Sequence, residues 1–193
     1  MSARVPDVPE RLETARLRLR ALRTADAVAL HAAVVESFEA LHAWMPWAQQ
    51  RPALSDIEAF LEKSVRGFAE RTSLDYLIVD KTSGTIAGVS GIPRLDWTVP
   101  KFEIGYWCRT AFTGRGYITE TVRAITTLAF ERLGAERVEV RCDADNTRSR
   151  RVIERCGFRL EGALRAEQRT PHGGLRTTLV FSLLPDEYRA LGR

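Results

Sequence analysis

Residues 102–121 constrain the fold most, because they follow the pattern of a strand, a tight glycine turn and the first turns of a helix. Residues 102–108 are rich in aromatic and branched side chains, which favour a pleated strand. Gly114 and Gly116 then let the backbone bend sharply and leave its N–H groups uncovered. Apolar residues recur at helical spacing beyond the turn: Val122, Ile125, Ala129, Phe130 and Leu133. Because N–H groups at a helix start lack partners and carry positive potential, this turn is predicted to bind an anion, most often a phosphate.

Three interpretations of the glycine turn compete. A nucleoside-triphosphate loop needs a Lys-Ser/Thr pair after its last glycine, and Tyr117 and Ile118 stand there instead. A dinucleotide-binding turn needs a third small residue, but the chain has Thr119, and the preceding strand follows a hairpin in mid-chain. A purely structural turn is compatible with the same residues. The turn by itself therefore excludes the first site, disfavours the second and leaves the third open.

Length and composition are those of a single globular domain. The chain has 193 residues, 45% apolar and 28% charged, and no apolar run approaches the length of a membrane span. Residues 1–10 lack the apolar core of a secretory signal. Three cysteines without CxxC spacing indicate neither a disulfide framework nor a zinc site, so a cytoplasmic location is expected. The net charge is +4, but the basic residues are spread along the chain and interleaved with acidic ones, so direct nucleic-acid binding is not expected.

The order of elements predicts an α/β fold. Residue patterns predict seven strands, at residues 17–22, 76–79, 86–92, 102–108, 137–142, 158–164 and 175–184. Helical periodicity falls before the second strand, where Ser55 and Glu58 have capping-box spacing, and after the fourth and fifth strands. Because hairpins alternate with βα crossovers, we expect a mixed, mostly antiparallel sheet of about seven strands with helices on both faces. A flexible lead-in, residues 1–12, is expected to precede one domain, residues 13–193.

Four motifs in this order resemble the GCN5-related N-acetyltransferase (GNAT) superfamily, and within it the branch of the ribosomal-protein serine and alanine acetyltransferases. They are E-I-G-Y-W at residues 103–107, G-R-G-Y-x-x-E at 114–120, N-x-x-S at 146–149 and C-G-F-R-L-E-G at 156–162. Further segments at both ends of the chain also fit, so the resemblance covers nearly all of it. Two positions depart from the pattern. Ala111 replaces a frequent Gln or Arg, and Thr177 replaces an acidic residue after Arg176, which alters the expected acceptor contacts.

The resemblance implies acetyl-coenzyme A as the donor and a primary amine as the acceptor, with direct transfer in a ternary complex and no metal. The N–H groups of the turn would hold the pyrophosphate: Gly114, Arg115, Gly116 and Tyr117. The backbone of the strand end would line the pantetheine like an added strand and bind the carbonyl oxygen under attack: Tyr106, Trp107 and Cys108. Asn146 would bond the pantetheine arm. Arg150 or Arg151 would approach the other phosphate, although a solvated helix explains these arginines equally well.

The acceptor's ammonium must lose a proton before its nitrogen can attack. An α-amine has a pKa near ~8, so a carboxylate acting through water suffices. The resemblance makes Glu103 the first candidate and Glu167 the second, and each is nearly as compatible with a surface or structural role. Ser149 matches the position suggested for protonating the departing thiolate, ahead of Tyr117, although a serine in a first helical turn also bonds backbone.

Trp44 and Trp47 are predicted to wall the acceptor cleft, with simple packing as the alternative. Cys108 and Cys142 have no evident His partner, which disfavours an acyl-cysteine mechanism. The expected function is an acetyl-CoA-dependent N-acetyltransferase, with a protein or peptide N-terminus favoured as acceptor over a small-molecule amine. The alternative is a non-catalytic acetyl-CoA-binding sensor. The sequence leaves open whether the chain forms a homodimer, and no membrane contact is expected.

Overall fold

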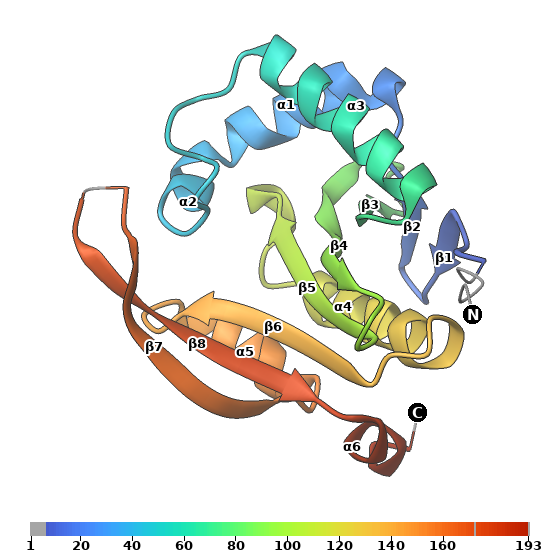
Figure 1. The fold of residues 1–193 in the computed structure, drawn as a ribbon. Helices are drawn as coiled ribbons and strands as arrows, with labels where there is room; N and C mark the ends of the chain where they lie inside the picture. Colours follow the sequence, from blue (N-terminus) through green and yellow to red (C-terminus); the bar gives the residue numbers. More distant parts are fainter. Residues whose placement is uncertain (1–6, 172, 193) are drawn as a thin grey trace.

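A computed structural model describes residues 7–171 and 173–192 and shows one eight-stranded sheet flanked by helices (Figure 1). The strands are β1 (Arg11–Glu13), β2 (Leu17–Ala21), β3 (Leu74–Asp80), β4 (Ile86–Asp96), β5 (Lys101–Cys108), β6 (Arg137–Asp143), β7 (Arg159–Arg169) and β8 (Leu175–Leu183). The helices are α1 (Ala27–Glu36), α2 (Phe38–His42), α3 (Leu54–Glu70), α4 (Tyr117–Thr127), α5 (Thr147–Arg155) and α6 (Pro185–Ala190).

The strand order β1-β2-β3-β4-β5-β6-β8-β7 contains one parallel neighbour pair, β5 with β6, and the other pairs are antiparallel. The pairing of β5 with β4 extends to Cys108, whereas its pairing with β6 ends where Ile104 meets Val140. Residues 105–108 therefore turn one backbone edge away from β6. The loop that leads to the glycine turn directly follows this edge in the chain.

The two faces of the sheet are covered differently. Behind β5, β6 and β8, helices α4 and α5 pack on an apolar layer, in which Ile104 and Val140 share one core cluster with Val122. On the other face, α1–α3 gather over β2–β4 (Figure 1), where Leu61 and Leu77 belong to a second cluster. The strands β6–β8 carry charged side chains on that second face. The face under α4 and α5 is thus apolar. The other face is apolar under α1–α3 and charged on β6–β8, and we call it the open side.

The predicted mixed, mostly antiparallel sheet is confirmed, and the additional strand is β1. It lies in the expected lead-in, of which residues 1–6 fall outside the described residues. Val8 is buried, and the Tyr76 hydroxyl donates to the carbonyl of Pro9 (2.8 Å). Residues 8–12 are therefore anchored to the domain. A strand of three residues is too short for alternation to reveal it.

Two helices depart from the sequence predictions. Helix α3 begins at Leu54, and its cap is the Asp56 carboxylate accepting from the Ala53 N–H (2.8 Å), so the capping box expected at Ser55 is wrong. Helix α6 had no prediction, although Pro185 stands at its start with acidic residues in its first turn. No helix within residues 7–171 and 173–192 combines the length and apolarity needed to span a membrane.

Candidate functional site

The glycine turn leads into α4, as predicted, with both glycines in the left-handed region of the backbone map. Gly114 and Gly116 each have φ +77°, which costs other residues energy. Gly116 is the residue before the helix, and no side chain caps it. A Cβ added at Gly114 would meet nothing within 4 Å. The first N–H groups of α4 therefore face an open space beside the positive end of the helix, which suits an anion.

A network of polar contacts from the start of β2 fixes this turn. The Glu120 carboxylate accepts from the Thr14 hydroxyl (2.5 Å) and from Arg16 Nε (2.7 Å), and Arg16 Nη1 donates to the carbonyl of Arg115 (2.9 Å). Burial raises the pKa of Glu120, but these hydrogen bonds outweigh it and lower the pKa overall. The network holds both sides of the turn in place. The sequence motif contained Glu120 but gave no sign of Thr14 or Arg16 as its partners.

The hydroxyl of Tyr117 points into the protein. It donates to Asp80 Oδ2 (3.2 Å), and the ring is buried beneath the Arg16 guanidinium. This side chain is already engaged, so it is a poor candidate for protonating a thiolate. What Tyr117 offers to a ligand is its backbone N–H at the helix start.

The free edge of β5 lies beside the start of α5. The hydroxyls of Tyr106 and Ser149 are hydrogen-bonded (2.8 Å), and the side-chain carbonyl of Asn146 accepts from the Ser149 N–H (3.0 Å). Asn146 is thus the cap of α5, which leaves its amide nitrogen available to a ligand. The structure brings together three residues that the sequence placed in the coenzyme site. The hydrogen bond between Tyr106 and Ser149 was not predicted.

The thiols near this edge are not activated. Burial raises the pKa of both Cys108 and Cys142 to about 11. At neutral pH these thiols therefore stay protonated, and a thiolate nucleophile is disfavoured.

On the opposite face of the sheet, three carboxylates surround one guanidinium. Glu103 of β5 lies directly across from Glu139 of β6. Arg141 lies 3.7 Å from Glu103, 3.5 Å from Glu139 and 3.7 Å from Glu167 of β7. Glu103 also forms a 2.9 Å pair with Arg94. Both predicted bases are thus neighbours in one cluster, which we call the carboxylate cluster: Glu103, Glu139, Arg141 and Glu167.

Glu167 lies within a bulge of β7. Leu164 pairs with Thr178 and Gln168 with Arg176, so β7 holds two more residues than β8 over this span. Ala166 has φ +55°, an unusual conformation for a residue with a Cβ. Such bulges redirect side chains, often next to active sites. This irregularity was not visible in the sequence.

The loop with Trp44 and Trp47 approaches this face. Arg176 Nη1 donates to the carbonyl of Trp44 (3.1 Å) and lies 3.7 Å from Asp143, while Arg176 Nη2 donates to Gln168 (2.5 Å). The Arg176 side chain is 9% exposed and holds the loop against β8. Trp47 is 51% exposed, so it is not core packing. The structure places both tryptophans on a segment tied to the charged face.

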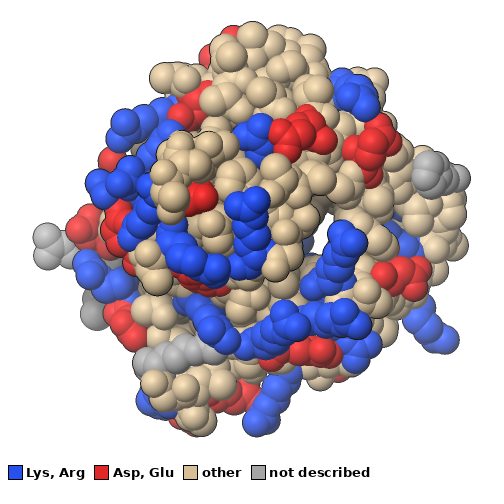
Figure 2. Space-filling model, turned by 180° about the vertical axis from the view of Figure 1, so that it is seen from behind, with Lys and Arg blue, Asp and Glu red and all other residues tan. Residues whose placement is uncertain are grey.

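Within the described residues, Arg150 makes no contact with the glycine turn. It pairs with Glu154 one helical turn along α5 (2.8 Å), as a solvated helix predicts. Basic side chains nevertheless gather on the face that carries α4 and α5 (Figure 2). The exposed arginines of α5 are Arg148, Arg150, Arg151 and Arg155. They make this face electropositive near the turn, which favours a polyanionic ligand.

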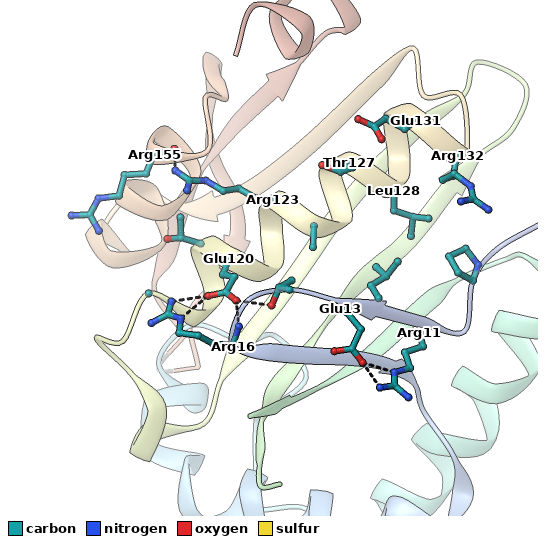
Figure 3. Close-up of a pocket in the computed structure, with 16 residues that line it drawn as sticks. Arg11, Glu13, Arg16, Glu120, Arg123, Thr127, Leu128, Glu131, Arg132 and Arg155 are labelled. Atoms are coloured by element: carbon teal, nitrogen blue, oxygen red, sulfur yellow. Dashed lines mark hydrogen bonds and ion pairs between the residues drawn. The ribbon is translucent and has the colours of Figure 1, made fainter. Parts of the chain in front are cut away.

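A separate groove of about 820 Å³ runs between α4 and the β1–β2 hairpin (Figure 3). The Arg16–Glu120 pair crosses one end, where Gly116 belongs to the lining, and Arg132 lies at the other end. None of the residues of the carboxylate cluster lines this groove. The groove therefore does not include the carboxylate cluster.

Comparisons with known proteins agree on one family. Residues 16–159 match the family described as "Acetyltransferase (GNAT) domain". The chain is 32% identical to "Putative ribosomal N-acetyltransferase YdaF" of Bacillus subtilis, over 89% of this chain and 93% of that protein. It is 25% identical to the "Ribosomal-protein-serine acetyltransferase" of Escherichia coli, over 75% of this chain and 86% of that protein.

Solved structures show the same fold. RimL, the ribosomal L7/L12 α-N-protein acetyltransferase solved with coenzyme A, superposes with a TM-score of 0.87 at 23% identity, covering 92% of this chain and 99% of that one. The microcin C7 self-immunity acetyltransferase MccE, solved with acetyl-CoA and AMP, gives 0.84 at 24% identity, covering 92% and 97%. At these identities the likeness concerns the fold.

Proposed function

This chain belongs to the GNAT acetyltransferase family and is an N-acetyltransferase, and we propose that it uses acetyl-CoA to acetylate the N-terminal amine of a protein or peptide. The observation that carries this proposal is the free edge of β5, which leads to an uncapped helix start and lies near a cluster of carboxylates. The named functions of the relatives support a protein acceptor.

The residues at the turn and along β5 fit an acetyl-CoA molecule. The open space at Gly114 leaves room for a pyrophosphate against the N–H groups of residues 114–117. Residues 106–108 offer an unpaired strand edge that pantetheine amides can join, and Asn146 offers its amide nitrogen. The coenzyme supplies an acetyl group activated as a thioester. The exposed arginines of α5 would add a favourable potential for its phosphates.

Groups of the chain itself can accept or donate the protons of the reaction and bind the oxygen on which negative charge develops. A carboxylate of the cluster accepts the proton that the acceptor's ammonium releases, directly or through water. An N–H among residues 106–108 binds the carbonyl oxygen while the amine nitrogen forms its bond to the acetyl carbon. As the carbon–sulfur bond breaks, the Ser149 hydroxyl would donate a proton to the departing sulfur and regain one through solvent from the amine nitrogen, which loses its second proton as the amide forms. The bond between Ser149 and Tyr106 keeps that hydroxyl in place.

Between the two carboxylates, we favour Glu167 as the base. Glu103 is already engaged by Arg94 at 2.9 Å, whereas the ion pair that the structure gives Glu167 is a loose one, 3.7 Å from Arg141. Without a close cation on its oxygens, Glu167 keeps them available to accept a proton, while the longer ion pair with Arg141 still orients the carboxylate. Glu103 would then add negative charge that attracts the acceptor's ammonium.

An acceptor screen with a free-thiol readout tests this proposal. The panel contains Ser-, Ala- and Thr-initiated peptides, their N-terminally blocked forms, amino acids, polyamines and aminoglycosides. We expect acetyl-CoA-dependent thiol release with the free peptides and none with the blocked ones. Release with only the small amines would reject the protein acceptor. Coenzyme binding without release from any amine would favour a sensor instead.

A further inference from the structure

We propose that Arg141 is a positioning residue that holds Glu167 at the acceptor side, together with the bulge at Ala166 that brings Glu167 to it. No local sequence pattern singles out Arg141. This inference rests on the proposed function, because it concerns how the carboxylates of that site are arranged. Two independent observations carry it, namely the contacts of Arg141 and the irregular backbone of β7.

Arg141 lies at the centre of the carboxylate cluster. Its three N···O distances of 3.5–3.7 Å connect β6 with both β5 and β7. The guanidinium is 34% exposed and the carboxylates are 12–29% exposed, so the ion pairs are only partly screened by solvent. One side chain thus links the two carboxylates that the sequence offered as alternative bases.

The other cations of this face have different targets. Arg94 pairs with Glu103, and Arg137 pairs with Glu139 at 2.7 Å and with Glu161. Glu103 and Glu139 therefore each keep a close partner without Arg141. Glu167 does not, because its ion pair within the described residues is the one to Arg141. Loss of Arg141 should therefore act on the reaction mainly through Glu167.

The backbone of β7 gives the second reason. The two additional residues between Leu164 and Gln168 interrupt the alternation of the strand, and Ala166 adopts a left-handed conformation that disfavours its Cβ. Strained backbone of this kind persists where the surrounding structure holds it, commonly at functional sites. Here the residue that follows is Glu167. The bulge and Arg141 thus determine the position of the same carboxylate from two sides.

Arg141→Gln, Arg141→Lys and Arg137→Gln test the proposal in steady-state assays of acetyl transfer. Arg137→Gln is the matched control, because it removes a cation from the same face of β6 that contacts neither Glu103 nor Glu167. We expect Arg141→Gln to lower kcat about tenfold, as for coupled charged neighbours, with acetyl-CoA affinity unchanged. Arg141→Lys should recover most of this loss. Arg137→Gln should stay within about threefold of wild type.

A double-mutant cycle separates positioning from a general structural effect. In a Glu167→Gln background, Arg141→Gln should have almost no further effect on kcat, because its action passes through the missing carboxylate. The proposal would be overturned if the decreases in kcat for Arg141→Gln and Glu167→Gln multiplied in the double variant. Equal decreases in kcat for Arg141→Gln and Arg137→Gln would also overturn it, as would wild-type kcat in a folded Arg141→Gln. If Arg141→Gln does not fold, Arg141→Met replaces it in the same cycle, with the same expected results. A wild-type chain that transfers acetyl to no amine would instead reject the proposed function.

Discussion

The two parts of the proposed site lie on different sides of the sheet and consist of different chemical groups. On the α4 side, the proposed coenzyme site consists mainly of backbone, namely the N–H groups of the glycine turn and the unpaired edge of β5, to which Asn146 and Ser149 of α5 add side chains. On the open side, the proposed acceptor site consists of side chains from β5, β6 and β7, with a loop tied down by Arg176. The backbone of the first belongs to one continuous segment, whereas the second exists only after the sheet has formed.

This difference predicts how each side responds to substitution. A backbone site fails when a residue cannot adopt the required φ and ψ, and it tolerates many side-chain changes. A side-chain site keeps its fold but loses activity when a single charge is removed. Substitutions on the α4 side should therefore weaken coenzyme binding. Substitutions on the open side should lower turnover with the coenzyme still bound.

The largest effect is expected at the glycine turn. Gly116→Pro should abolish acetyl-CoA binding, because proline fixes φ near −65° and Gly116 has φ +77°. Isothermal titration calorimetry measures this affinity, and circular dichroism confirms the fold.

The matched pair for this test is Gly116→Ala and Gly134→Ala. Both glycines have positive φ and neither is crowded, so each alanine should cost about 1 kcal/mol of stability. Only Gly116→Ala should weaken acetyl-CoA binding. Equal affinities for the two variants would remove the turn from the coenzyme site.

The next effect is expected at the carboxylates. Glu167→Gln should lower kcat about a hundredfold, the usual contribution of a general base, with acetyl-CoA affinity unchanged. Glu103→Gln should lower kcat less, because Glu103 is engaged by Arg94. Steady-state kinetics with a Ser-initiated peptide measures both variants. The reverse ranking would make Glu103 the base.

A smaller effect is expected at the bulge of β7. Ala166→Val should lower kcat about tenfold, because a β-branched residue resists φ +55° and should shift Glu167 away from Arg141. Ala166→Gly relaxes the same backbone without a new side chain, so it should raise thermal stability slightly and keep kcat within about threefold. Thermal unfolding and steady-state kinetics measure the two variants. Unchanged kcat in a folded Ala166→Val would show that the bulge does not position Glu167.

The smallest effect is expected at the acceptor loop. Trp47→Ala should raise the acceptor KM about threefold and leave kcat unchanged, because an exposed indole offers contact area and no proton chemistry. Val28→Ala, an exposed apolar position on α1, is the control and should leave KM as it is. A wild-type acceptor KM for Trp47→Ala would mean that the indole does not contact the acceptor.

The sequence could predict the geometry of the strand, turn and helix on the α4 side because its requirements are local. A turn at φ +77° needs glycine, and Gly114 and Gly116 are adjacent to the strand and helix that they connect. Asn146 and Ser149 lie three residues apart, so their contact follows from helix geometry alone. The seven predicted strands are also local patterns of side chains.

The acceptor side could be predicted only in part. Glu103 and Glu167 were named, but no local pattern indicates that Arg141 lies between them, because that depends on the strand order β5-β6-β8-β7. The conformation of Ala166 also has no sequence signal, since alanine rarely has positive φ. Contacts between different strands of the sheet thus cannot be predicted from local sequence patterns, even where the individual residues can be named.

The most direct test is to locate the acetyl group that the wild-type chain transfers. A peptide that begins with Ser and contains one internal Lys is incubated with acetyl-CoA and the protein, and its fragments are analysed by mass spectrometry. We expect one acetyl group on the N-terminal amine and none on the lysine. An acetyl group on the lysine alone, or an unmodified peptide in the presence of bound acetyl-CoA, would contradict it.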